Sequence, residues 1–203
     1  MREDFIGSGR CRCRVILERG VRPPVVLLHG YSFTSDVWRD VGLLQALEGM
    51  GIPYVAIDMP YGRISRCSAK SRDVELNQSL VEEAVRGILG GQAPLVIGAS
   101  LGGYHAVLYS LRNRALGLVL VAPVNVSGGE VLERAKLVRP RTLVIYGDRD
   151  DVVDLAELRP FVDAVGAELK VYRGAGHAAY LDRPREFVED VIAFYKHIAG
   201  SGT

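Results

Sequence analysis

The chain has 203 residues, 48% hydrophobic and 24% charged, a composition that buries one sizeable core and predicts a single globular domain over residues 1–203. Its 25 Lys and Arg residues nearly balance 24 Asp and Glu residues, giving a formal net charge of +1 without a basic cluster, so we expect neither a nucleic-acid partner nor a polybasic membrane patch. No apolar run approaches the roughly 20 residues of a bilayer span and the N-terminus lacks a signal-peptide pattern, so we expect no membrane span, a cytoplasmic location and a small-molecule substrate.

The chain contains three cysteines, Cys11, Cys13 and Cys67. They are too few and too unevenly spaced to predict a disulfide framework. A Cys-x-Cys pair without a second Cys or His pair nearby is also poor spacing for zinc. We therefore expect structural or incidental thiols and no metal site.

Two kinds of strand are expected along the chain. Residues 10–17 alternate polar and apolar side chains, which is typical of a half-buried strand near a sheet edge. Six later runs are short and mostly apolar throughout, the pattern of strands covered on both faces of a parallel sheet. These runs are residues 25–28, 54–57, 95–97, 118–121, 142–146 and 169–172.

Segments with helical periodicity lie between these runs, at residues 35–47, 71–89, 101–112, 131–137, 154–165 and 184–198. Ser71 ahead of Asp73, Asp154 and Pro184 provide helix start signals. The alternation of strand and helix predicts an α/β fold: a doubly wound, mainly parallel sheet with helices on both faces. Only about seventeen residues separate Pro123 from Arg141, which leaves room for one helix and no cap domain over the sheet.

The pentapeptide G-A-S-L-G at residues 98–102 comes directly after one apolar strand and directly before a helix. This is the G-x-S-x-G nucleophile elbow in the context that it requires, in which a sharp turn presents the serine hydroxyl. A serine hydroxyl is a weak nucleophile and needs a base that is itself oriented by a third group. Ser100 is therefore the predicted nucleophile.

The base and the acid follow downstream in the order serine, acid, histidine. His177 ends a Gly-Ala-Gly-His segment after one predicted strand, and Asp150 ends a Gly-Asp-Arg-Asp segment after another. Both positions lie at the strand ends where Ser100 also lies, so we predict a Ser100, His177 and Asp150 triad. Among the other carboxylates of this loop, Asp154 is expected to cap a helix.

The remaining three histidines are weaker candidates for the base. His29 stands at a strand end and is expected to be a structural hydrogen-bonding residue. His105 lies on the helix after the elbow, facing the core or a neighbouring element, and His197 lies near the C-terminus. Acyl transfer also needs backbone donors for the oxyanion, for which we predict the amides of Leu101 and Tyr31.

No G-x-G-x-x-G or Walker pattern occurs in the chain, so no nucleotide cofactor is expected. Gly102 and Gly103 are interpreted as residues that permit close packing at the turn. We expect catalysis without any cofactor.

Several of these motifs together resemble the α/β-hydrolase superfamily over nearly the whole chain. They are His29-Gly30, Asp58-Met59-Pro60, the 98–102 elbow, Gly147-Asp148-Arg149-Asp150 and Gly174-Ala175-Gly176-His177. Residues 28–38, and residues 174–182 with Pro184, look more closely like the small lidless abhydrolase branch that includes CCG-interacting factor B. The resemblance implies a Ser-His-Asp hydrolase that acts on acyl esters or related acyl groups without metal or organic cofactor.

The chain departs from many members of that superfamily at Tyr61, where glycine commonly follows Asp-x-Pro. Without a lid, the acyl pocket must be lined by loops. The candidates for this lining are Tyr31, Phe33, Tyr61, Val124 and Tyr180.

The leading hypothesis is a serine hydrolase, a carboxylesterase that cleaves small or short-chain carboxylic esters through an acyl-enzyme. A thioesterase or an acyl-amide deacylase with the same triad is the second possibility, since pocket shape alone separates these substrates. A non-catalytic binding or scaffold protein on a hydrolase fold is the third. Aspartate-dependent dehalogenase or epoxide-hydrolase chemistry is disfavoured because serine occupies the nucleophile position. The sequence leaves the oligomeric state open.

Overall fold

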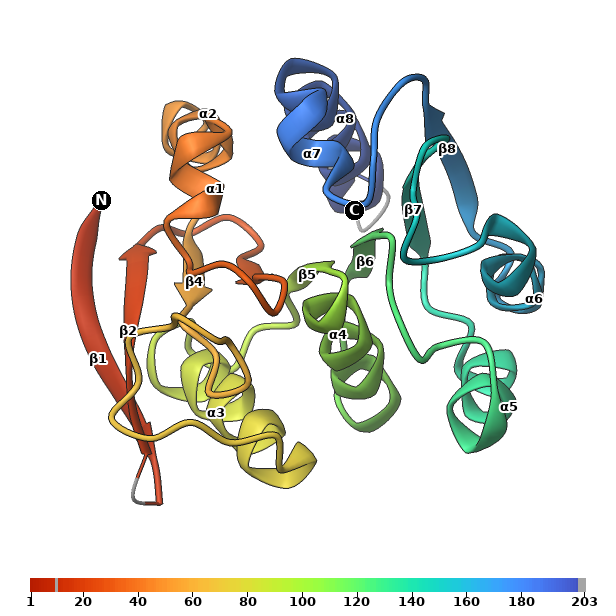
Figure 1. The fold of residues 1–203 in the computed structure, drawn as a ribbon. Helices are drawn as coiled ribbons and strands as arrows, with labels where there is room; N and C mark the ends of the chain where they lie inside the picture. The colour runs from red at the N-terminus through yellow and green to blue at the C-terminus, as the bar shows by residue number, and fades with distance from the viewer. Residues whose placement is uncertain (10, 201–203) are drawn as a thin grey trace.

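Eight strands form one sheet in the computed structural model, which describes residues 1–9 and 11–200 (Figure 1). Their spatial order is β1-β2-β4-β3-β5-β6-β7-β8. The strands are β1 (Arg2–Ser8), β2 (Cys11–Glu18), β3 (Val25–Leu28), β4 (Tyr54–Ile57), β5 (Leu95–Ala99), β6 (Gly117–Val121), β7 (Thr142–Gly147) and β8 (Glu168–Tyr172). Strand β2 pairs antiparallel with β1 and β4, whereas β4, β3, β5, β6, β7 and β8 pair parallel. The predicted mainly parallel sheet is confirmed.

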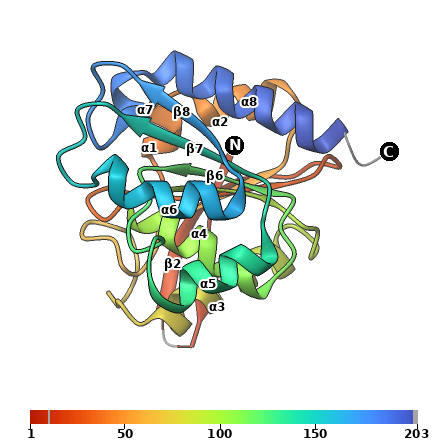
Figure 2. The same cartoon turned by 90° about the vertical axis from the view of Figure 1, so that its right-hand side faces the viewer.

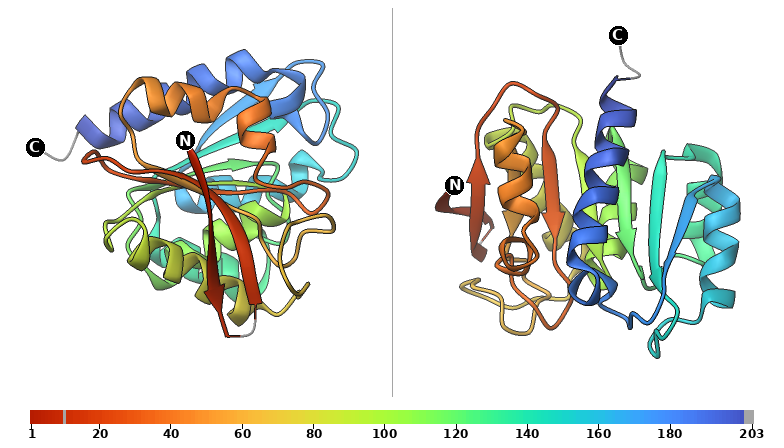
Figure 3. Two further views of the ribbon diagram at one scale, coloured as in Figure 1. Left: turned by 90° about the vertical axis from the view of Figure 1, so that its left-hand side faces the viewer. Right: turned by 90° about the horizontal axis from the view of Figure 1, so that it is seen from above.

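Two layers of helices cover the two faces of this sheet, as Figures 2 and 3 show. One layer contains α1 (Val37–Asp40), α2 (Leu43–Gly49), α7 (Ala179–Asp182) and α8 (Pro184–Gly200). The other contains α3 (Val74–Gly87), α4 (Leu101–Arg112), α5 (Gly129–Val138) and α6 (Leu155–Val165). Each layer encloses its own apolar core against the sheet. Every residue of β3 to β7 is buried, because helices cover both faces, and this explains the continuously apolar strands.

Several boundaries differ from the prediction. Strand β1 was not expected, since Arg2–Ser8 is polar and lacks a regular apolar alternation; it pairs with β2 at the exposed edge of the sheet. The helix expected over 35–47 is two helices, because Gly42 adopts a left-handed backbone (φ 83°) between them. Asp73 and Asp154 cap α3 and α6 by accepting hydrogen bonds from the Leu76 and Ala156 amides. Among the described residues, α5 is the one helix between β6 and β7, so no cap domain covers the sheet.

The buried Arg14 of β2 forms an ion pair with the segment that follows β4. The Arg14 guanidinium is nearly inaccessible and pairs with Asp36 at 2.6 Å and with Asp58 at 3.3 Å. Burial disfavours the charged form of Asp58, but hydrogen bonds from Ser35 and Arg66 and the nearby Arg14 charge outweigh it and hold the pKa of that carboxyl below its usual value. A buried carboxylate and guanidinium thus satisfy each other at the sheet edge.

A disulfide joins Cys13 to Cys67, so the expectation that these two residues are thiols is wrong. The antiparallel pairing of β2 with β4 brings Cys13 opposite the segment that follows β4, where Cys67 forms an isolated bridge with it. Spacing along the chain cannot reveal this contact, since it depends on strand register. Cys11 keeps a buried free thiol, as expected.

No helix of the described residues combines the length and the apolar character needed to cross a membrane.

His105 lies on α4 and is buried, in the helix layer that contains α3 to α6. Its ring stacks on Tyr61 with centroids 4.9 Å apart, and the Gln78 side-chain amide donates to Nδ1 at 3.0 Å. Burial, with a smaller contribution from the Arg112 charge, lowers the pKa of His105 to about 4. The ring is therefore neutral in the folded protein at neutral pH.

Removal of the Cys13–Cys67 disulfide is expected to destabilise the fold. The bond closes a loop with a sequence separation of 54 residues, and cross-links of this kind stabilise a domain by about 2–4 kcal/mol, chiefly by restricting the unfolded chain. Cys67→Ser should lower the free energy of unfolding by that amount in denaturant titrations under oxidising conditions. Addition of a dithiol should lower the wild-type stability to that of the variant. An unchanged unfolding midpoint in both cases would contradict this role.

The neutral His105 should make the fold sensitive to acid. Its folded pKa lies below the unfolded value of 6.5, so the unfolded chain binds the proton more readily and stability falls as the pH drops from about 6.5 to about 4. The loss approaches about 3 kcal/mol for this group. His105→Phe, which keeps a ring against Tyr61, should flatten the slope of unfolding free energy against pH in that window and leave it unchanged above neutral pH. A variant slope equal to the wild-type slope would refute this assignment.

Candidate active site

Ser100 occupies the sharp turn between β5 and α4. Its backbone has φ 52° and ψ −115°, a conformation that a non-glycine residue adopts rarely and that costs about 1–3 kcal/mol. The Ser100 amide donates to the Val121 carbonyl at 2.8 Å, which fixes the turn against β6. The local strain is therefore held by the sheet, and it presents the side chain above the strand ends.

The glycines of the elbow are required by close backbone approach. A Cβ on Gly98 would lie 2.3 Å from the Gly102 carbonyl oxygen, and a Cβ on Gly102 would lie 2.2 Å from the carbonyl oxygen of Leu28. Neither position tolerates a side chain without moving backbone. The first turn of α4 thus packs directly on the end of β3, as predicted for Gly102. Gly103 is also closely packed, since a Cβ there would lie 2.8 Å from Pro123 Cβ.

His177 reaches Ser100 from the loop after β8. Its Nε2 lies 2.9 Å from Ser100 Oγ, and the ring is mostly buried. Two carboxylates shape this loop: Asp148 accepts from the Gly174 amide at 2.6 Å, and Asp182 accepts from the Gly176 amide at 2.8 Å. The ring is positioned by backbone contacts on both sides.

Asp150 lies on the other side of the imidazole. His177 Nδ1 lies 2.9 Å from Oδ2 and 3.1 Å from Oδ1 of a carboxylate that is fully buried. The Val152 and Val153 amides donate to Oδ1 at 2.8 and 3.0 Å. The carboxylate accepts the Nδ1 proton, so Nε2 is free to accept the serine hydroxyl proton. The structure brings the three predicted side chains into one hydrogen-bonded line.

The two predicted oxyanion donors belong to segments that lie next to Ser100. The Leu101 amide is the first of α4 and has no acceptor within the helix. The loop that carries Tyr31 lies beside Ser100, because a Cβ on Gly30 would be 3.7 Å from Ser100 Cβ. Both predicted donors are therefore backbone amides of segments adjacent to Ser100.

His29 fixes the loop that carries Tyr31. Its Nδ1 donates to the Gly30 carbonyl at 2.8 Å, and its Nε2 accepts from the Met59 amide at 2.9 Å. Burial lowers the pKa of His29, and a neutral ring is what one donated and one accepted bond require. The structure gives His29 the hydrogen-bonding role expected from the sequence.

A cleft of about 270 Å³ opens above the Ser100 hydroxyl. Its side-chain walls include Tyr31, Phe33, Val152 and Tyr180, together with Ser100 and His177. The volume is below the usual range for drug-sized ligands, about 300–1,000 Å³. Of the candidate lining residues, Tyr31, Phe33 and Tyr180 border this cleft. Val152, which the sequence did not single out, borders it too, from the turn that also holds Asp150.

Tyr61 and Val124 do not line this cleft. The Tyr61 side chain is buried beneath it, stacked on His105, and donates its hydroxyl proton to the His29 carbonyl at 2.6 Å. It supports the loop of His29 from below, so the prediction of a lining role is wrong. Val124 borders a neighbouring hollow of about 540 Å³, which shares Val152 with the cleft.

Aromatic packing holds Tyr180 in the cleft wall. Its ring stacks on Trp38 at 5.3 Å and meets Phe33 edge-on at 6.3 Å. The Tyr180 hydroxyl is buried without a hydrogen-bond partner among the described residues. Burial raises the pKa of this hydroxyl, so it stays protonated.

One group of side chains among residues 1–9 and 11–200 has the closeness needed to share a metal ion: the sulfur atoms of Cys11, Cys13 and Cys67 lie within 4.8 Å of one another. Metal binding by cysteine needs thiolates. Two of these sulfurs are joined in the disulfide, and none of the three cysteines lines the cleft at Ser100.

Comparison with known proteins gives a consistent family assignment. Residues 25–142 match the model of the Alpha/beta hydrolase family. ABHD14A of Danio rerio is 33% identical over 178 residues, which covers 85% of this chain and 64% of that protein. The chain thus spans less than two thirds of the length of that relative. ABHD14B of Rattus norvegicus, named a "Putative protein-lysine deacylase", is 32% identical over 184 residues, covering 89% of this chain and 87% of that protein.

A solved structure supports the same assignment. The CIB-like hydrolase from Thermoplasma acidophilum superposes with a TM-score of 0.85 at 26% identity, over 97% of this chain and 98% of that chain. The family match, the ABHD14 relatives and the absence of a cap over the described sheet agree with one another. The chain belongs to the alpha/beta hydrolase family, in its lidless ABHD14 branch.

Proposed function

We propose that the protein is a serine hydrolase that cleaves small acyl esters through an acyl-enzyme. The observation that carries the proposal is the hydrogen-bonded line from Ser100 Oγ through His177 to the buried Asp150 carboxylate. This is the arrangement that activates a serine hydroxyl at neutral pH.

In this mechanism Ser100 Oγ attacks the acyl carbonyl while His177 Nε2 takes the hydroxyl proton. Asp150 stabilises the resulting imidazolium and keeps its orientation. The amides of Leu101 and Tyr31 donate to the oxyanion. His177 then protonates the leaving alcohol, and a water molecule, deprotonated by the same ring, releases the acid.

The size and walls of the cleft support short acyl groups. A volume of about 270 Å³ walled by Phe33, Val152 and Tyr180 suits a compact apolar group. Larger groups would reach the neighbouring hollow, where Val124 is the second contact. Because no cap covers the described sheet, the leaving-group side is open. The leaving alcohol therefore does not have to pass beneath a cap.

A second candidate is the hydrolysis of acylated lysine, favoured by the printed name of the ABHD14B relatives, "Putative protein-lysine deacylase". An uncapped cleft admits a side chain on a protein surface, and the same triad serves an amide or a thioester. The third hypothesis, a non-catalytic binding protein, does not explain why the Asp150 carboxylate is buried against His177 or why the Ser100 backbone is strained.

The Cys13–Cys67 disulfide is relevant to the cellular compartment in which the protein works. Disulfides in cytoplasmic proteins are usually transient, catalytic or redox-sensing. A cytoplasmic location, which we retain as part of the proposal, thus calls for a bond that can turn over. The free thiol of Cys11 lies 3.5 Å from one sulfur of this bond.

Ser100→Ala should abolish hydrolysis of p-nitrophenyl acetate. Removing the nucleophile of such a triad costs on the order of 10⁶-fold in kcat, so kcat should fall by about that factor, and a fluorophosphonate probe should label the wild type at Ser100 alone. Ser110→Ala, a change to a buried serine on the same helix, is the matched control and should retain activity. A catalytically active Ser100→Ala protein would reject the mechanism.

The acyl preference should follow the size of the cleft. We expect kcat/KM for p-nitrophenyl acetate to exceed that for the octanoate by about tenfold or more, because a single extra methylene in a hydrophobic pocket already changes discrimination by about 10- to 200-fold. Acetyl-lysine peptides measured in parallel decide between the two candidates. A higher kcat/KM for the peptide than for the ester would favour the deacylase, and a preference for octanoate would contradict the proposed cleft.

A further inference from the structure

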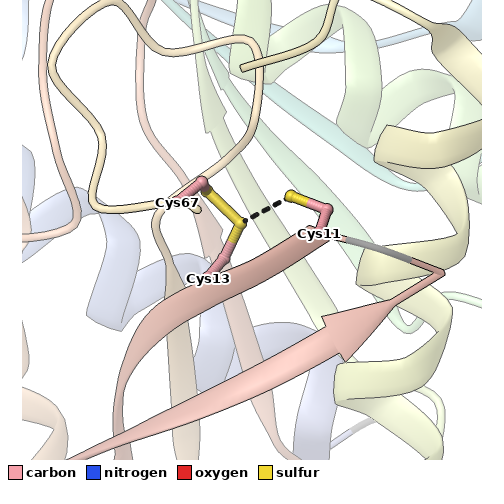
Figure 4. A group of neighbouring side chains, drawn as sticks. All are labelled: Cys11, Cys13 and Cys67. Atoms are coloured by element: carbon pink, nitrogen blue, oxygen red, sulfur yellow. Dashed lines mark hydrogen bonds between the residues drawn. A yellow bond between two sulfur atoms is a disulfide. The ribbon is translucent and has the colours of Figure 1, made fainter. Parts of the chain in front are cut away.

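The three cysteines lie side by side (Figure 4). Two of them belong to β2, which lies next to the edge strand β1. Cys11 and Cys13 are two residues apart on β2 and point to the same face, and Cys67 comes from the segment after β4. Cys13 and Cys67 share the disulfide. The free Cys11 thiol is 3% exposed, and its Sγ lies 3.5 Å from Cys13 Sγ. A thiol is thus held against one sulfur of a disulfide.

We propose that these residues form an internal thiol–disulfide exchange site. The Cys11 thiolate attacks Cys13 Sγ, the Cys11–Cys13 bond forms, the Cys13–Cys67 bond breaks, and Cys67 leaves as a thiolate that takes up the proton lost by Cys11. One disulfide replaces another, so no external oxidant or reductant is needed. The exchanged pair is geometrically accessible, because residues two apart in a strand have Cα atoms about 6.6 Å apart, within the range that disulfides span.

The leaving sulfur has polar neighbours that suit a thiolate. The Ser65 hydroxyl donates to Cys67 Sγ at 3.8 Å, and the Lys70 ammonium donates to Ser65 Oγ at 2.9 Å. A hydroxyl backed by a cation stabilises negative charge on sulfur, which makes the thiolate a better leaving group. The Asp58 carbonyl oxygen lies 3.0 Å from the same sulfur, so the released thiol has an acceptor once it is protonated.

Exchange would remove the covalent anchor from residues 58–70. This segment supports the loop beside the nucleophile through three hydrogen bonds: Met59 N to His29 Nε2 at 2.9 Å, Tyr61 Oη to the His29 carbonyl at 2.6 Å, and Arg63 N to the Tyr31 carbonyl at 2.8 Å. The Tyr31 loop supplies one of the two oxyanion donors in the proposed function, on which this step of the inference rests. We therefore infer that the exchange state of the cysteines tunes hydrolytic activity.

Disulfide mapping tests the exchange itself. The oxidised protein is incubated at mildly alkaline pH without added thiol, denatured in acid, blocked with N-ethylmaleimide and digested with trypsin, which separates residues 11–12, 13–14 and 67–70. We expect a fraction of molecules with fragments 11–12 and 13–14 linked and Cys67 blocked. In Cys11→Ser the Cys13–Cys67 bond should be the sole product. Wild-type protein in which Cys67 remains fully disulfide-bonded throughout would overturn the proposal.

Activity measurements test the coupling to the cleft. Cys67→Ser represents the released segment and should lower kcat/KM for p-nitrophenyl acetate by about fivefold or more, a usual size for coupling between sites, at a temperature where the variant is fully folded. Cys11→Ser, which keeps the anchor, should match the wild type. Equal kcat/KM in Cys67→Ser and wild type would refute the coupling. If oxidised wild type neither hydrolyses esters nor reacts with fluorophosphonate, the proposed function fails, while the mapping still decides whether exchange occurs.

Discussion

The close contact between the first turn of α4 and the end of β3 is the constraint on which the site depends. It requires bare backbone at Gly102, where a Cβ would lie 2.2 Å from the Leu28 carbonyl oxygen, and the approach of α4 to β5 requires it at Gly98, where a Cβ would lie 2.3 Å from the Gly102 carbonyl oxygen. This approach forces Ser100 into its left-handed conformation, costing about 1–3 kcal/mol, which the buried parallel strands on either side offset. It also places the start of α4 beside the loop of Tyr31, so that the nucleophile and both proposed oxyanion donors derive from one packing contact.

A second set of interactions, all polar and buried, supports that loop from the sheet edge. His29 bonds to the Gly30 carbonyl and the Met59 amide, and Tyr61 bonds to the His29 carbonyl. Next to Met59, Asp58 receives the Arg14 guanidinium of β2. Partly satisfied buried polar groups are costly, whereas satisfied networks specify one arrangement. The segment after β4 therefore works as a rigid support beneath the cleft, and the disulfide of Cys67 fastens it to β2.

The cysteines and Tyr61 show why the roles of some residues could not be predicted from the sequence. Cys13 and Cys67 are 54 residues apart in sequence, and their contact exists because β2 runs antiparallel to β4 in one register. The expected lining role of Tyr61 assumed that its loop lies over the site, but the ring turns inward to stack on His105. Strand β1 was missed for a related reason: at an exposed edge, backbone hydrogen bonding to β2 forms the strand without an apolar pattern.

The sequence by itself determined the features that depend on residues close together in the chain. The apolar periodicity specified the alternating strands and helices, and the elbow glycines around Ser100, with Asp150 and His177 after later strands, marked the edge where the carboxyl ends of parallel strands meet. Only the tertiary structure decided which side chains face the cleft, which cysteines pair and what holds the Tyr31 loop. Those outcomes depend on strand register and side-chain direction across elements distant in sequence, where a one-residue shift turns a side chain to the opposite face.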